Sequence, residues 1–297
     1  MTRRRFFSRA MVAGSLALIS SGALAAPRKP SVPTAWSAAT PMPLGDAAIG
    51  YAHAQCDTHP NSFYVISGAN ERLAFTTNAW RYDADTDTWN ALAPIPHLHG
   101  REGLAAVCHQ GFIYVAGGAG YAVDASNQLF IYDVANDTWS AGADIPRNVW
   151  GAAMGAFGGQ VYLMGGDADY FWPGGTSNEV DIYDIATNTW TNTGAPMPVA
   201  AHQPGWAQVG QYVYVVGGYA DTSPASNVNV TQRYDMSANT WTIGPTFTSA
   251  RASAPTWSRA ARCGRWTAWA PSPYSTASTS TVRRNPAPPA GPRRPWS

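Results

Sequence analysis

Short runs of alternating apolar and polar residues recur along most of the chain. Between residues 104 and 141 such runs occupy positions 104–108, 112–116, 128–132 and 138–141, and they are rich in β-branched and aromatic side chains. Gly, Asn, Asp and Pro separate the runs, and residues of these types favour tight turns. The pattern predicts an all-β fold whose units each contain four short strands.

The four-strand unit repeats with a nearly constant period. Five tryptophans, separated by 53, 50, 51 and 51 residues, mark it: Trp36, Trp89, Trp139, Trp190 and Trp241. Seven residues before each of the last four stands a Tyr that precedes Asp, at Tyr82, Tyr132, Tyr183 and Tyr234. A pair of small residues comes before each of these Tyr, at Ser67 and Gly68, Gly117 and Gly118, Gly165 and Gly166, and Gly217 and Gly218. A fixed period of this length indicates a repeat architecture.

The order of double glycine, tyrosine and tryptophan resembles the Kelch family of β-propellers, from Trp36 to Trp241 or about two-thirds of the chain. The resemblance implies four-stranded blades packed radially around a central channel. We predict about four complete blades, near residues 36–89, 90–139, 140–190 and 191–241, and the start of a fifth, so that the ring is incomplete. The repeated Gly, Tyr and Trp then serve the fold, because Gly permits close backbone approach and the rings fill the space between blades.

The N-terminal residues have the pattern of an export signal. Arg3, Arg4 and Arg5 precede an apolar stretch over residues 10–24, and Ala25 ends a small-x-small cleavage pattern. The paired arginines resemble the twin-arginine motif, which implies export in the folded state. An ordinary Sec signal or an uncleaved anchor is the alternative. We predict a signal peptide over residues 1–25, a linker over residues 26–35 and a periplasmic or extracellular protein.

Charge divides the chain into three parts. The net charge is +1, yet residues 1–25 contain four Arg and no acid, and residues 251–297 contain eight Arg and no acid. Residues 26–250 therefore carry all 18 acids and a net charge of −11. An acidic body lacks the basic face that binds phosphates, so we expect no nucleic-acid partner. No apolar run after the leader approaches the roughly 20 residues that cross a bilayer, so we expect no stable membrane insertion after cleavage.

Residues 251–297 break the repeat. A fifth blade would place a double glycine near residue 269 and a Tyr-Asp pair near residue 285, and the sequence has neither. The Arg, Pro and Ser content is typical of a disordered tail. The alternative is a slip of the reading frame after about Ser253, because the shifted codons permit a line that resembles residues 209–218.

Kelch-like propellers meet their ligands with loops at one end of the channel. The resemblance points to loops that precede the first strand of a blade, with Arg101, Arg147, Trp150 and His202. It also points to loops that follow the double glycine, with Asp167, Tyr170, Trp172 and Tyr219. Aromatic rings stack on sugar faces and charged groups hydrogen-bond hydroxyls, so these residues suit a glycan. The alternative is that each is an ordinary loop residue.

The sequence offers few signs of catalysis. It contains no nucleophile elbow, phosphate loop or dinucleotide fingerprint, and we expect no cofactor. His97 and His99 could flank a metal, but no third ligand is placed by spacing, so no metal site is predicted. Kelch copper radical oxidases require a further His late in the chain, and none follows His202.

We therefore predict an exported binding module for a glycan or protein ligand, without catalysis. The alternative is a sugar enzyme similar to the Kelch-type sialic-acid mutarotases. Anomer interconversion needs an acid/base pair and an Arg that binds a carboxylate. Arg101 or Arg147, with Glu102 or Glu179, would supply these groups, although nothing in the sequence singles them out.

Three cysteines are too few for a disulfide framework in a chain of 297 residues. Cys56 and Cys108 occupy comparable positions in neighbouring repeats, which is compatible with a bridge. We favour the interpretation that they are two small buried hydrophobic residues.

Overall fold

The computed structural model describes residues 38–43, 51–69, 74–97, 99–120, 125–169, 175–220, 226–246 and 257–259. The chain divides into two compact units, Met1–Ala38 and Ala39–Ser297, and every strand belongs to the second. The predicted signal peptide, the linker and Trp36 lie outside the described residues, as does the C-terminal tail apart from residues 257–259. No helix long and apolar enough to cross a membrane occurs in the part of the chain that the structure describes.

The predicted all-β fold of four-stranded units is confirmed, with four antiparallel sheets that we call blades 1 to 4. Blade 1 consists of β1 (Ala52–Ala54), β2 (Ser62–Ile66), β3 (Ala79–Asp83) and β4 (Thr88–Leu92). Blade 2 consists of β5 (Glu102–His109), β6 (Phe112–Ala119), β7 (Leu129–Asp133) and β8 (Thr138–Ala141). Blade 3 consists of β9 (Ala153–Phe157), β10 (Gln160–Met164), β11 (Val180–Asp184) and β12 (Thr189–Thr191).

Blade 4 contains β13 (Gly205–Val209), β14 (Tyr212–Val216), β17 (Val230–Asp235) and β18 (Thr240–Thr246). Between β14 and β17 the chain forms a two-stranded antiparallel ribbon of β15 (Tyr219–Ala220) and β16 (Ser226–Asn227). A short strand from the tail, β19 (Trp257–Arg259), pairs in parallel with β13. It extends the blade 4 sheet as a fifth strand, so the described residues include no separate fifth blade.

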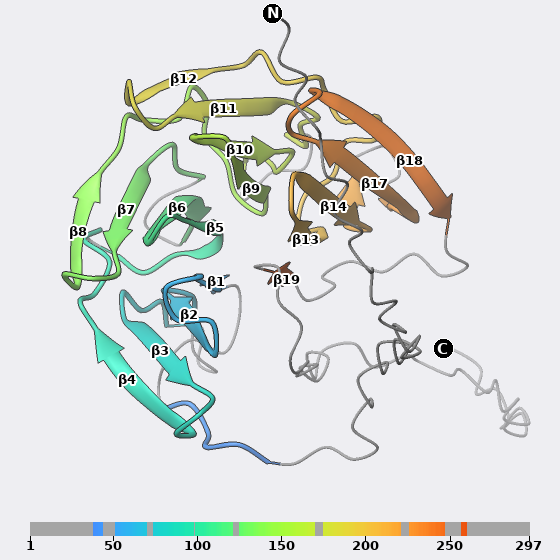
Figure 1. Ribbon diagram of the computed structural model, residues 1–297. Coiled ribbons are helices and arrows are strands. Elements are labelled where there is room, and N and C mark those ends of the chain that lie inside the picture. Colours follow the sequence, from blue (N-terminus) through green and yellow to red (C-terminus); the bar gives the residue numbers. More distant parts are fainter. Residues whose placement is uncertain are drawn as a thin grey trace, which may run out of the picture. The chain divides into compact units, whose positions relative to one another are not determined.

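The first strands of consecutive blades lie side by side, β1 with β5, β5 with β9 and β9 with β13 (Figure 1). Backbone hydrogen bonds connect equivalent residues of successive blades, since Gly151 N donates to Gly103 O and Gln203 N donates to Gly151 O, both at 2.7 Å. The double glycines permit this packing. Gly165 has φ +66°, and a Cβ there would lie 2.6 Å from the carbonyl oxygen of Ala201. The predicted close backbone approach is therefore present.

The apolar core lies between blades rather than within any one of them. One buried cluster joins blades 2, 3 and 4, and a second joins blades 1 and 2. In blades 1 to 3, a tyrosine of the second strand packs on the third-strand tyrosine of the next blade. The ring centroids are 6.4 Å apart for Tyr64 and Tyr132, 6.1 Å for Tyr114 and Tyr183, and 5.8 Å for Tyr162 and Tyr234. The repeated Tyr thus fills the space between blades, as predicted.

The repeated Trp has a second role, which is to hold the linker between blades. In blade 2, Trp139 Nε1 donates to Ala93 O at 2.8 Å, and Ala93 N donates to Asp137 Oδ1 at 2.8 Å. The hydroxyl of Tyr132 donates to the same Asp137 oxygen at 2.6 Å. Both polar backbone groups of Ala93, which directly follows β4 of blade 1, are therefore bound by the outer hairpin of blade 2. We call this arrangement the linker clamp.

The linker clamp recurs in each blade. Blade 1 binds Thr40 through Trp89 and Asp87, blade 3 binds Ala143 through Trp190 and Asn188, and blade 4 binds Ala195 through Trp241 and Asn239. The acceptor residue always has left-handed backbone, with φ from 51° to 54° at Asp87, Asp137, Asn188 and Asn239. Asp and Asn tolerate this conformation and also present a side-chain oxygen, which explains their place in the repeat.

The favoured interpretation of Cys56 and Cys108 as unpaired residues is wrong. They form a disulfide with a Cα–Cα distance of 5.2 Å. The two strands β1 and β5 are neighbours, so residues one repeat apart come together near the ends of those strands. Among the described residues, a cluster of potential metal ligands consists of these two cysteines and Asp57, and the disulfide already occupies both sulfur atoms.

Replacing the acceptor of a linker clamp should weaken the fold. We expect Asp137→Ala to lower the free energy of unfolding by about 1–2 kcal/mol, because it removes two hydrogen bonds and places alanine in left-handed backbone. Asp137→Asn is the matched control, since Asn188 and Asn239 hold the same position in blades 3 and 4. Urea unfolding followed by tryptophan fluorescence measures both variants, and equal losses would contradict the clamp.

Reduction of the disulfide should also lower stability. The bridge closes a sequence separation of 52 residues. A cross-link of this kind contributes about 2–4 kcal/mol, largely by restricting the unfolded chain. We expect a dithiol reductant to lower the urea midpoint of the natural chain and to leave that of Cys108→Ser unchanged. A midpoint that the reductant does not alter in either protein would contradict the bridge.

Candidate functional site

Four of the predicted ligand-binding residues come together where blades 3 and 4 meet. Trp150 and Asp167 form a two-residue antiparallel bridge, with both backbone hydrogen bonds at 2.9 Å. His202 and Tyr219 form the equivalent bridge in the next blade, also at 2.9 Å. Each bridge joins the loop before a first strand to the residue after a double glycine. The two loop types that the resemblance singled out are therefore held to each other by backbone bonds.

The aromatic side chains of this site form a short column. The ring of His202 lies between those of Trp150 and Tyr219, with centroid distances of 5.3 Å and 5.6 Å. Trp150 and His202 are 9% and 7% exposed, whereas Tyr219 is 37% exposed. Tyr219 is therefore the member of the column that presents substantial ring surface to solvent.

The buried carboxylate of Asp167 contacts the central ring of the column, that of His202. Asp167 is 1% exposed, and its Oδ2 lies 3.4 Å from His202 Nδ1 and accepts a hydrogen bond from Thr176 Oγ1 at 3.2 Å. Thr176 Oγ1 also lies 2.9 Å from His202 Nδ1. The other oxygen, Oδ1, accepts from Asp169 N at 2.8 Å. Asp167 and Thr176 thus both contact Nδ1 of His202.

Thr176 is a site residue that sequence reasoning missed. It stands in the segment that returns from the loop after the double glycine, and Asp167 and Thr176 form an isolated bridge. A threonine in a polar loop carries no distinctive signal. An alignment of the repeats would have offered one, because blade 2 has Ala125 at the equivalent position.

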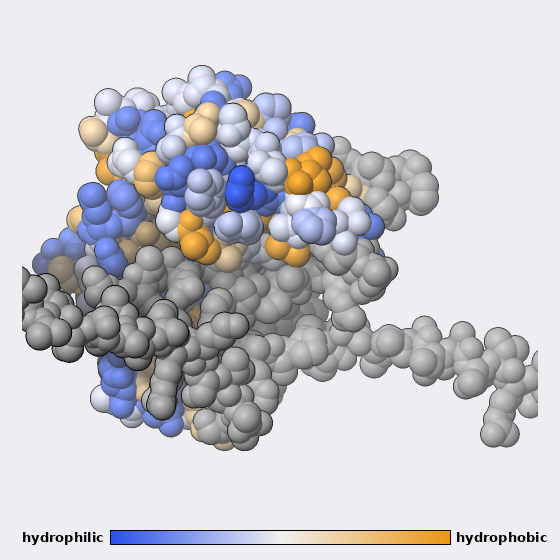
Figure 2. Space-filling view, turned by 45° about the vertical axis from the view of Figure 1, so that its right-hand side comes forward, coloured by the Kyte–Doolittle hydropathy of each residue, from blue (hydrophilic) through white to orange (hydrophobic). Residues whose placement is uncertain are grey.

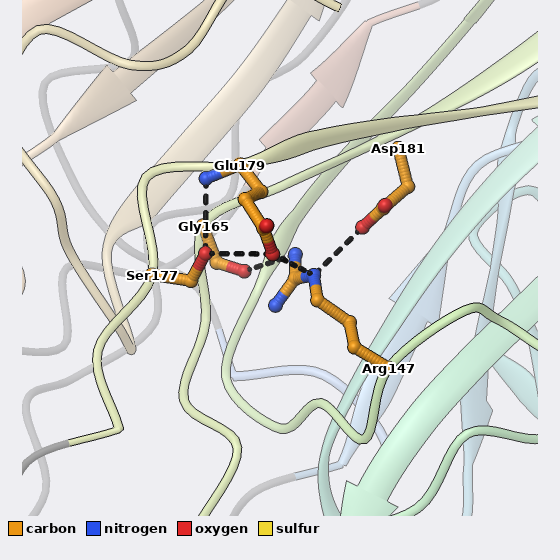
Figure 3. Close-up of polar contacts among 5 residues, drawn as sticks. All are labelled: Arg147, Gly165, Ser177, Glu179 and Asp181. Atoms are coloured by element: carbon orange, nitrogen blue, oxygen red, sulfur yellow. Dashed lines mark hydrogen bonds and ion pairs between the residues drawn. The ribbon is translucent and has the colours of Figure 1, made fainter. Parts of the chain in front are cut away.

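Arg147 binds groups of its own blade (Figure 3). Its Nε donates to Asp181 Oδ2 at 2.8 Å and lies 3.2 Å from Glu179 Oε2, while Nη2 donates to Gly165 O at 2.8 Å. The side chain of Asp181 is 2% exposed and that of Glu179 is 53% exposed. Burial raises the pKa of Asp181, and the positive charge of Arg147 acts in the opposite direction.

Arg101, in the loop before β5, also binds groups of its own blade, blade 2. Its Nη1 donates to Ser126 Oγ at 2.7 Å, and its Nη2 donates to Gln128 Oε1 at 2.5 Å. The whole residue is 6% exposed, and burial lowers its pKa. The structure therefore places Arg101 and Arg147 in contacts within their blades and not with Trp150, His202 or Tyr219. Glu102 is half-buried at the start of β5.

Arg147 and Asp181 occupy a pair of positions that each blade fills differently. In blade 2 the pair is His97 and Phe130, with ring centroids 5.8 Å apart. In blade 4 it is Val199 and Gln232, where Val199 N donates to Gln232 Oε1 at 2.8 Å and Gln232 Nε2 donates to Val199 O at 2.9 Å. Burial lowers the pKa of His97 to about 4, so its ring is neutral at pH 7. In three blades the pair thus joins the incoming loop to the third strand.

Tyr170 and Trp172, the remaining predicted ligand-binding residues, lie outside the described residues. His99, the other candidate for flanking a metal, lies in the loop before β5.

Comparisons with known proteins agree with this architecture. The family model for the KLHDC2/KLHL20/DRC7 Kelch-repeats domain matches residues 50–263. Kelch-like protein 25 of Xenopus tropicalis is 32% identical over 94 residues, which are 30% of this chain and 15% of that protein. Kelch-like protein terF of Aspergillus terreus is 31% identical over 99 residues, which are 32% of this chain and 21% of that protein. The chain thus spans about a fifth or less of the length of these relatives.

A solved structure titled "Structure of YjhT" superimposes with a TM-score of 0.58 and 17% identity, over 72% of this chain and 69% of that chain. At this identity the likeness concerns the fold alone. It supports the assignment of the four sheets to propeller blades.

The hydrogen-bonded pair of Val199 and Gln232 in blade 4 should be able to substitute for the ion pair of Arg147 and Asp181 in blade 3. We expect Arg147→Val to cost about 3 kcal/mol of unfolding free energy, because it leaves the buried Asp181 without its cation. The double variant Arg147→Val with Asp181→Gln recreates the pair of Val199 and Gln232 and should recover most of this loss. Urea unfolding of the two variants measures the difference. A double variant as unstable as the single one would show that the positions are not equivalent.

Proposed function

The chain belongs to the Kelch-repeat family whose model matches residues 50–263, and on that basis we propose that it is a non-catalytic binding module for a protein or glycan ligand. The ligand meets the loop face of blades 3 and 4 at Tyr219. The observation that carries this proposal is the aromatic column, in which the exposed ring of Tyr219 stacks on the buried, hydrogen-bonded ring of His202.

His202 is placed to hold the ring of Tyr219 in one orientation. His202 is stacked beneath its ring, and the backbone of Tyr219 is bonded to that of His202 in both directions. A ring that is fixed before binding loses little entropy when a ligand packs on it. Exposed tyrosines of this kind are frequent anchors in protein interfaces, and their faces also stack on sugars. The predicted signal peptide would bring this surface to the periplasm or the cell exterior.

A second candidate function is anomer interconversion of a sugar. The observation that favours it is the contact of Asp167 with His202, which is an acid/base pair in a family where such chemistry occurs. Arg101 and Arg147, the residues expected to bind a substrate carboxylate, are engaged with their own blades. This candidate therefore rests on the pair of Asp167 and His202 alone.

Tyr219→Ala should weaken ligand binding by about tenfold or more, because an anchoring aromatic ring contributes about 2 kcal/mol or more. The control is Phe112→Ala, which removes an aromatic side chain of similar exposure, 40%, from the start of β6 in blade 2. A glycan array and a display library of peptides identify the ligand, and titration calorimetry compares the variants. Equal effects of the two changes would contradict the site.

The natural chain and its variants also distinguish the binding module from the sugar enzyme. Exchange NMR of reducing sugars detects anomer interconversion. Accelerated exchange that is lost in His202→Ala and kept in Tyr219→Ala would establish the enzyme in place of the binding module.

A further inference from the structure

In each of the three contacts between blades, a second-strand tyrosine packs on a third-strand tyrosine of the following blade. This pattern leaves one tyrosine of the first blade and one of the last blade without such a partner among the described residues. The second-strand tyrosines that pack on a following blade are 1 to 3% exposed, namely Tyr64, Tyr114 and Tyr162. The third-strand tyrosines that receive them are 0 to 2% exposed, namely Tyr132, Tyr183 and Tyr234. Tyr214 of blade 4 and Tyr82 of blade 1 hold the equivalent positions and are half-buried. Tyr214 has no aromatic partner among the described residues.

Blade 4 accordingly has one sealed face and one open face. Trp206, Val215 and Gln232 lie opposite one another in register and are 0 to 5% exposed, on the face toward blade 3. Tyr214 and Arg233 are paired in register and are half-buried, and so are Tyr212 and Val216. Val209, which pairs with Tyr212, is 45% exposed. We call Val209, Tyr212, Tyr214, Val216 and Arg233 the open face.

Figure 2 brings the blade 4 side of the molecule forward and shows apolar residues interspersed with polar ones on its described surface. An arginine within the open face is compatible with a contact between blades. Arg81 holds the position of Arg233 in blade 1, and there it bonds to His59 beside the packed pair of Tyr64 and Tyr132. The guanidinium of Arg233 already lies 4.8 Å above the ring of Tyr212. The open face therefore has the composition of the other blade contacts.

The register of β19 indicates what covers this face. Ala207, Gln208 and Val209 of β13 pair with Trp257, Ser258 and Arg259, each exactly 50 residues later in the chain. That offset lies within the 50 to 53 residues that separate the repeated tryptophans, so β19 corresponds in sequence to the first strand of a following repeat. It differs from β1, β5, β9 and β13, which belong to separate sheets, because it is hydrogen-bonded to β13 as a fifth strand of the blade 4 sheet. It lies beside β13 near the centre of the blades (Figure 1).

Charge agrees with this placement. Residues 251–297 contain eight Arg and no acid, whereas residues 26–250 carry a net charge of −11. Asp235, paired with Tyr212, places one of these acids at the edge of the open face. A basic segment is attracted to an acidic body, and the attraction weakens as salt increases.

We propose that residues 247–297 fold back on the open face of blade 4, with β19 as the inner strand, and take the place that a following blade would occupy. The segment lacks the double glycine and the Tyr-Asp pair of a regular repeat. It is therefore an atypical closing element that covers Tyr214 without forming a fifth regular blade. This proposal is independent of the ligand site at Tyr219.

The test measures nitration of Tyr214 by tetranitromethane, read by mass spectrometry of peptides, in three chains. The first is the full chain, and the second ends at Thr246, so that the open face is uncovered. In the third, a second copy of residues 142–191 replaces residues 244–297, which presents a regular blade with its own copy of Tyr183 to Tyr214. In the full and truncated chains, Tyr162, sealed between blades 3 and 4, reports whether the fold is intact. The chimera contains two copies of Tyr162, so Tyr114, sealed between blades 2 and 3, reports there instead.

We expect Tyr214 of the full chain to be nitrated several-fold more slowly than in the truncated chain, and at a rate close to that of the chimera. High salt should raise the rate in the full chain alone. Equal rates in the full and truncated chains would overturn the proposal. Protection that increases with protein concentration would also overturn it, because a second copy of the chain would then cover the face.

If nitration of Tyr162 shows that the truncated chain does not fold, the urea-unfolded full chain replaces it as the exposed reference. A full chain whose Tyr214 reacts as it does in that reference, while Tyr162 stays protected, overturns the proposal.

Discussion

Each blade of this protein binds both polar backbone groups of one residue in the preceding linker. A four-stranded sheet of strands only three to eight residues long has little core of its own, so it must pack on its neighbours. Stacked tyrosines and backbone bonds between first strands hold the inner part of each contact. The linker clamp holds the outer part, because Trp139 and Asp137 fix Ala93 where the chain leaves one blade for the next. The spacing of about 51 residues is the length of chain between successive clamps.

The fold could be predicted from the sequence because its determinants repeat. The runs at 104–108, 112–116, 128–132 and 138–141 correspond within a few residues to β5, β6, β7 and β8. The clamp could not be predicted in the same way. Its central residue is Thr40 in blade 1 and Ala93, Ala143 or Ala195 in blades 2 to 4, and a residue that acts only through its backbone N–H and C=O leaves no chemical signal in a sequence.

The candidate site was predictable to a lesser degree, for a related reason. The structure joins Trp150, Asp167, His202 and Tyr219, which belong to the two predicted loop types, at one place. Their role in ligand binding stays a prediction. The arginines in the same loops bind within their blades, because a buried guanidinium takes the nearest carbonyl and carboxylate oxygens. Residue type does not distinguish a charge that serves the fold from one that faces a ligand. The disulfide between Cys56 and Cys108 shows the same limit, since it depends on which strands are neighbours.

A repeat architecture offers a way to separate structural from functional residues. Where blades differ but each difference is compensated, as in the pairs of His97 with Phe130, Arg147 with Asp181 and Val199 with Gln232, the position serves packing. The position after the double glycine behaves otherwise. Blades 1 and 2 have the fully buried Ala69 and Ala119 there, whereas blades 3 and 4 have Asp167 and Tyr219. A buried carboxylate requires compensation by Thr176 and His202, and an exposed ring gains nothing from the fold. Blades 1 and 2 show that this position of the fold does not require either group, which supports the proposal of a ligand at Tyr219.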